Sequence, residues 1–97
     1  MKVFKYVVKN EDVRNLAGDE KTLQEVLAGL NPKENIIELD YSNVLDPVVS
    51  MSAGLIYQKI LDSGFPKIIV KGHKNKVQLA ESPMMKIMIK RNQLEIQ

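Results

Sequence analysis

The stretch that decides the fold runs from residue 34 to residue 71 and reads ENIIELDYSNVLDPVVSMSAGLIYQKILDSGFPKIIVK. Its first part, 34–41, places apolar side chains on one face at a period of two, which is typical of a β-strand. Residues 47–63 are apolar over a wide arc at helical spacing, and 67–71 contains the continuous apolar run of a strand buried on both faces. These segments predict a right-handed βαβ crossover in which the two strands are parallel.

The ends of this helix carry residue types that start and stop helices. Asp46-Pro47 places an N-cap residue before a proline at the first helical position. Gly64 suits the left-handed conformation after the last turn, and Pro66 prevents the helix from continuing. A helix with so wide an apolar arc needs cover on more than one side, from its own fold or from a partner.

Further elements are predicted before this stretch. Val3–Val8 alternates as a strand does, and residues 12–17 are a weaker candidate for a second strand. A helix should follow Gly18-Asp19, because aspartate caps the free N–H groups of a first turn. Its apolar stripe, spaced i, i+3, i+4 and i+7, consists of Leu23, Val26, Leu27 and Leu30.

After the stretch the pattern is less decisive. Asn75 begins a capping-box pattern, which predicts a short helix over 76–81. Ser82-Pro83 is a second cap-plus-proline signal, yet residues 86–90 alternate as a strand would, so periodicity leaves helix and strand open there. Residues 94–96 are predicted to form a last edge strand.

Length and composition bound the class of protein. The 97 residues suit one domain, 1–97, with an α/β fold: a mixed four- to five-stranded sheet with a βαβ core and helices packed on it. The absence of cysteine and the single histidine exclude thiolate metal sites and a histidine-based triad within one chain. We expect no catalytic residue, no metal and no cofactor, and hence not an enzyme. No apolar stretch approaches the roughly 18 residues of a membrane span, so we expect a cytoplasmic protein without a membrane partner.

The charge is uneven, since residues 66–97 carry 7 basic and 2 acidic side chains. This supports an alternative function, a small nucleic-acid-binding module that contacts phosphates through lysines. The lysines concerned are Lys67, Lys71, Lys74, Lys76, Lys86 and Lys90. The candidate anion contacts after the predicted central strand are Lys71, His73, Lys74 and Lys76, and a ligand pocket or small enzyme site near His73 is a third alternative.

The segment Ile36-Ile37-Glu38-Leu39-Asp40-Tyr41-Ser42-Asn43-Val44 resembles the strand signature of STAS domains, the anti-sigma factor antagonist family. Val13–Glu20, with Leu16 and Gly18, is similar to the family's preceding strand. The resemblance extends over roughly residues 2 to 96. It implies a single STAS-like domain, of which a divergent STAS-like regulator is one form.

Such a domain is generally non-enzymatic and acts by docking onto a protein partner. The resemblance implies a partner of the anti-sigma factor, kinase or ATPase type, and we expect a monomer or weak homodimer. Docking would use the strand end and switch helix over residues 42–57. The residues placed there are Ser42, Asn43, Asp46, Ser50, Met51, Ser52 and Gly54.

Many family members carry a phosphorylated serine in an Asp-Ser-Ser-Gly pattern at the start of the switch helix. A gapless alignment from Leu39-Asp40 puts Val48-Val49-Ser50-Met51 there, which keeps one serine, Ser50. A shift of two residues keeps Ser52 instead. Ser50 and Ser52 are therefore the phosphorylation candidates, because a phosphate near a helix start meets free N–H groups.

Overall fold

The computed structural model describes residues 1–8, 23–44 and 51–97, with side chains over 1–8, 23–44 and 54–97. Residues 23–28 are helical. The other elements, in chain order, are β1 (Lys2–Val7), the 3-10 helix η1 (Pro32–Glu34), β2 (Asn35–Asp40), α3 (Met51–Asp62), β3 (Ile68–Lys71), α4 (Lys76–Glu81), α5 (Pro83–Lys90) and β4 (Leu94–Ile96). The fold is therefore α/β, as predicted.

The four described strands form one sheet in the order β1-β2-β3-β4, and every neighbouring pair is parallel. Strands β2 and β3 are parallel, as predicted, with α3 between them in the chain. The predicted mixed sheet is wrong for the described strands, because the chain returns along α5 before β4 and enters it in the same direction as β3. The predicted strand 12–17 lies outside the described residues.

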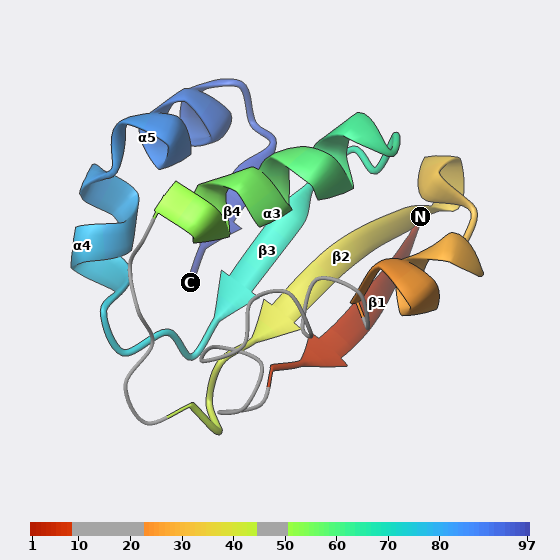
Figure 1. Cartoon of the computed structure of the whole chain (residues 1–97), viewed down its shortest axis with the longest axis horizontal. Coiled ribbons are helices and arrows are strands. Elements are labelled where there is room, and N and C mark those ends of the chain that lie inside the picture. Colours follow the sequence, from red (N-terminus) through yellow and green to blue (C-terminus); the bar gives the residue numbers. More distant parts are fainter. Residues whose placement is uncertain (9–22, 45–50) are drawn as a thin grey trace.

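The helices that the structure describes lie on one face of this sheet (Figure 1). Strands that follow one another in spatial and chain order require this arrangement, since right-handed crossovers then place each connection on the same side. Beneath the helices, side chains that lie opposite one another on neighbouring strands pack together. Buried to 2% exposure or less on this face are Ile37, Leu39, Ile68, Val70 and Leu94.

The opposite face of the sheet, here called the charged face, carries ion-paired side chains together with the exposed apolar residues Val3 and Val7. Side chains alternate between the faces of a strand, so the neighbours of the buried residues point away from the helices. Ion pairs join adjacent strands there, with nitrogen–oxygen distances of 3.2–3.3 Å. They are Lys5–Asp40, Lys71–Glu38 and Lys67–Glu95. None of the helices in the described residues covers this face, and the ion pairs satisfy charged side chains that lie on it.

The helix limits follow the predicted signals at some positions and not at others. Gly64 has a φ of 103°, as its predicted role after α3 requires. The helix 76–81 is confirmed, although Asn75 makes no side-chain capping bond. The start predicted at Asp46-Pro47 lies outside the described residues. In the earlier helix, Leu23 and Leu27 are buried as predicted, whereas Val26 is 37% exposed and lies outside the stripe.

The open question after residue 82 is resolved as a helix. Met85 and Met88 are buried on α5 at a spacing of three, while Ile87 and Ile89 are exposed. A strand over 86–90 would instead have placed the apolar members of that alternation on one buried face. The last strand, β4, is present at the predicted residues 94–96.

A matched pair of substitutions in β3 tests the two faces. Ile68→Ala should lower the free energy of unfolding by about 2–5 kcal/mol, because a fully buried isoleucine leaves a cavity. Ile69→Ala removes the same atoms in the same strand from the charged face and should cost clearly less. Urea denaturation of both variants measures the difference, and equal losses would contradict the assignment of the faces.

Candidate functional site

The carboxyl ends of β2 and β3 bring two loops together, residues 41–44 and residues 72–75. Gly72 has a φ of 70°, and a Cβ atom there would lie 2.9 Å from the backbone nitrogen of Ser42. Only glycine tolerates both the left-handed conformation and this close approach. In parallel sheets this edge is where ligands and partners commonly bind.

The loop after β2 is a turn held from both ends. The Val44 N–H donates to the carbonyl of Tyr41 at 2.9 Å, and the Ser42 N–H donates to the Asp40 carboxylate at 2.9 Å. From the neighbouring loop, the Lys74 ammonium donates to the carbonyl of Val44 at 2.7 Å. These bonds fix a turn whose tip, Ser42 and Asn43, is exposed.

Asp40 is held ionised by the same turn. Hydrogen bonds from the Ser42 side chain and the Ser42 backbone lower the pKa of Asp40 from 3.8 to about 2, against the raising effect of burial. The nearby Lys5 ammonium lowers this pKa further. Because the pKa is lower in the folded protein, Asp40 stabilises the fold above about pH 4, and this contribution is lost as the pH falls towards 2.

His73 follows β3 directly but is buried, with 5% of its surface exposed. Its Nδ1 accepts a hydrogen bond from the Asn75 N–H at 3.1 Å, and its ring lies 4.9 Å from the ring of Tyr41. Burial lowers the pKa of His73, which favours the neutral imidazole. Burial therefore disfavours a positive charge for a phosphate at His73, while its contacts with Tyr41 and Asn75 pack this edge.

Of the other candidate anion contacts, Lys71 and Lys74 interact with groups of the same chain, and Lys76 is exposed on α4. Lys71 pairs with Glu38 on the charged face, and Lys74 binds the carbonyl of Val44. Lys67 is also paired, with Glu95, so part of the predicted nucleic-acid surface is already engaged within the chain.

The predicted docking residues divide into three groups. Ser42 and Asn43 form the exposed tip of the turn. Gly54 is buried in α3, where a Cβ atom would lie 2.8 Å from the Sδ atom of Met84, so this glycine permits the packing of α3 against α5. The third group lies outside the described part of the chain. It consists of Asp46, Ser50 and the side chains of Met51 and Ser52, so neither phosphorylation candidate can be placed.

Two contacts of this edge were not predicted. The hydroxyl groups of Tyr41 and Tyr57 are 2.6 Å apart and join the start of the turn to α3. The bond from Lys74 to Val44 links residues 30 positions apart. Both tyrosines stood in predicted elements, but no local pattern marks such pairs, because they depend on how α3 and the loops pack on the sheet.

Comparison with known proteins gives no relatives: no family model matches the chain, and neither does any curated protein or solved structure. Among the described residues, no three histidine, aspartate or glutamate side chains are grouped so as to hold a metal ion. Within the same ranges, none of the helices has the length and apolar character needed to cross a membrane.

The pKa of Asp40 should respond to its partners in a defined order. Ser42→Ala removes the largest cause of the lowered pKa, so the pKa should rise from about 2 towards 3.8. Lys5→Met should raise it less. Side-chain carboxyl titration by NMR measures both shifts, and a larger rise with Lys5→Met would contradict this order of causes.

Alanine substitutions at Gly72 and Gly29 test the close approach of the two loops, with Gly29 as the control. Gly72→Ala should destabilise the protein by about 1–3 kcal/mol, because alanine is strained in the left-handed region and its Cβ would meet the Ser42 backbone. At Gly29 the nearest atom to an added Cβ is 3.7 Å away, so Gly29→Ala should be neutral or stabilise by up to about 1 kcal/mol. Thermal unfolding compares the two, and a neutral Gly72→Ala would show that the loops can separate freely.

Proposed function

We propose that this protein is a non-enzymatic regulator that docks onto a protein partner through residues 42–57, as its resemblance to anti-sigma factor antagonists implies. The observation that carries the proposal is the exposed Ser42–Asn43 tip, presented by a turn that Asp40 and Lys74 hold in place. A surface already ordered before binding loses little conformational entropy on association. Such a turn is therefore suited to recognition.

The turn is also connected to α3, the helix that the resemblance assigns to docking. Tyr57 is 1% exposed, and its hydroxyl lies 2.6 Å from that of Tyr41, directly before the turn. This hydrogen bond joins the turn to α3. We expect a partner to engage the turn and the beginning of α3 as one surface.

The chemistry of the tip indicates the kind of contact. Asn43 offers a neutral amide, and the Ser42 oxygen, whose proton is donated to Asp40, can still accept a hydrogen bond. Contacts between neutral groups depend little on salt. Nucleic-acid binding through the exposed lysines of α4 and α5 would weaken steeply as salt increases. Salt dependence therefore distinguishes the proposed docking from the alternative.

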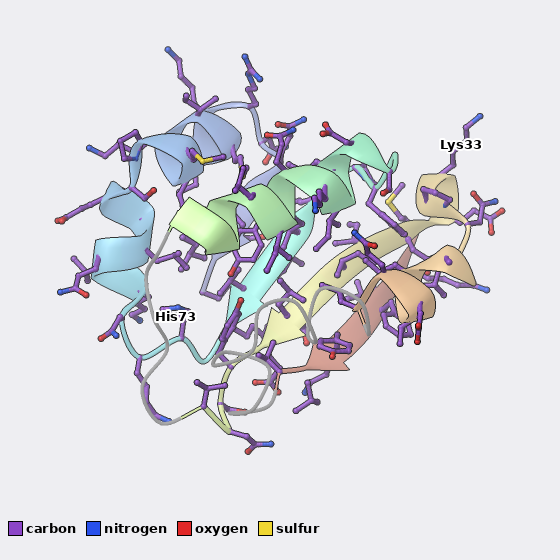
Figure 2. The ribbon with its side chains drawn as sticks, viewed as in Figure 1. Lys33 and His73 are labelled. Atoms are coloured by element: carbon purple, nitrogen blue, oxygen red, sulfur yellow. The ribbon has the colours of Figure 1, made fainter. Side chains whose placement is uncertain are left out.

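Asn43→Arg should abolish capture of the partner without unfolding the domain, because a bulky charge then occupies the tip of the turn. Glu34→Gln is the control, since it changes the net charge by the same amount at an exposed residue of η1. Lys33 in Figure 2 marks η1, at the far end of β2 from His73. Affinity capture with wild type and both variants, followed by protein identification, measures the effect.

A protein retained by wild type and Glu34→Gln, lost with Asn43→Arg and stable to moderate salt would support the proposal. A protein retained equally by Asn43→Arg would contradict docking through the turn. Recovery of nucleic acid alone, released by salt from all three forms, would instead favour the lysine surface of Lys76, Lys86 and Lys90.

A further inference from the structure

The outer surface of the helix layer carries exposed aliphatic side chains where α5 packs beside the beginning of α3 (Figure 1). The two helices meet at Gly54, where an added Cβ atom would touch the side chain of Met84. Leu55 follows this glycine, and Ile87 lies about one helical turn after Met84. Leu55 and Ile87 are 53% and 52% exposed, and Met84 is partly buried. We call Leu55, Met84 and Ile87 the α3–α5 patch.

The cations beside this patch have no acidic partner. Lys90 and Arg91 lie three and four positions after Ile87, so they are its neighbours on the surface of the helix, and Lys86 precedes Lys90 by four positions. All three cations are exposed. Among the described residues, none of the three side chains takes part in a hydrogen bond or an ion pair. Residues 82–93 contain no aspartate or glutamate, so the positive charge there is unbalanced.

The combination of aliphatic and positively charged side chains favours one class of partner. A phosphate backbone would pair with the cations but would not cover Leu55 and Ile87, and surfaces that bind single strands usually add aromatic side chains. Here α5 contains no aromatic residue, and Tyr57 of α3 is buried. A bilayer would require the apolar side of α5, which Met85 and Met88 bury in the core. An acidic amphipathic helix offers apolar side chains and carboxylates together.

We propose that the α3–α5 patch binds an acidic amphipathic helix of a protein partner. Apolar side chains of that helix, spaced i, i+3 or i+4 and i+7, cover Leu55 and Ile87. Its carboxylates pair with the three cations of α5. Leu55 also belongs to the docking region 42–57, but the patch does not use the turn at 41–44. Either proposal can therefore fail without the other.

The first test selects ligands without assuming their sequence. Random peptides long enough for about four helical turns are displayed on phage and selected on the immobilised wild-type protein. The enriched peptides should have a net negative charge and apolar residues at helical spacing. No enrichment, or enrichment of neutral or basic peptides, would overturn the proposal.

The second test compares two exposed isoleucines of α5. Ile89 is 40% exposed and lies two positions after Ile87, which places it about 200° further around the helix. Ile87→Ser should weaken binding of an enriched peptide about tenfold, because it removes an apolar contact at the centre of the surface. Ile89→Ser should leave the affinity unchanged. Fluorescence anisotropy measures both, after thermal unfolding has shown that the variants fold.

Leu55→Ser provides the same test from α3 and should also weaken binding about tenfold. It keeps the proposal testable if a serine at residue 87 unfolds the protein. Unchanged affinity in a folded Leu55→Ser or Ile87→Ser variant would overturn the proposal, as would an equal loss with Ile89→Ser.

The third test examines charge and the competing classes of ligand. Lys90→Gln should weaken peptide binding about two- to fivefold, the effect of one exposed ion pair. Lys33→Gln is the control, because it makes the same change at an exposed residue of η1. Asn43→Arg, in the turn, should bind the peptide as the wild type does. Loss with Asn43→Arg would overturn a separate surface. Displacement of the peptide by single-stranded DNA or by phosphatidylglycerol vesicles, equally from wild type and Ile87→Ser, would overturn the assignment of the partner.

Discussion

The pairing of β2 with β3 is the interaction on which the rest of the structure depends. Ile37 lies opposite Ile68 and Leu39 opposite Val70, and all four side chains are at most 2% exposed beneath the helix layer. This parallel pair aligns the carboxyl ends of both strands, so the loops that follow them meet at one edge. The turn at residues 41–44 and the loop at 72–75 are neighbours for this reason.

The charged face of the sheet complements this core. A parallel sheet is usually covered on both faces, since apolar strands leave unfavourable surface in water. Here the described helices lie on one side, and cross-strand ion pairs occupy the other. Glu38 is only 8% exposed, and its partner Lys71 supplies the charge that such a position needs. Among the described residues, the buried core thus lies on the helix side of the sheet and the cross-strand ion pairs lie on the other, beside exposed Val3 and Val7.

The two ends of the sheet differ in character. At the carboxyl edge, hydrogen bonds hold a polar turn at the surface. At the amino edge, a pocket lies between the helix at 23–28 and α3, lined by apolar side chains and by Gln24, Lys59 and Ser63. The sequence analysis named Ser42 and Asn43 as docking residues, and both lie at the exposed tip of the turn. It predicted neither the pocket nor the burial of His73, because both arise where separate elements pack.

The sequence by itself determined which segments form β2, α3 and β3, because side-chain periodicity and stop signals such as Gly64 act within a few residues of the chain. It also determined the buried face of β2 through Ile37 and Leu39, whereas the prediction that the strand at 67–71 is buried on both faces is wrong, because Ile69 is only partly buried on the face opposite the described helices. Only the tertiary structure decided that the described strands are all parallel, that residues 86–90 form a helix, and that Lys74 binds the carbonyl of Val44. Those outcomes depend on the register and packing of segments far apart in the chain, which no local pattern of residues encodes.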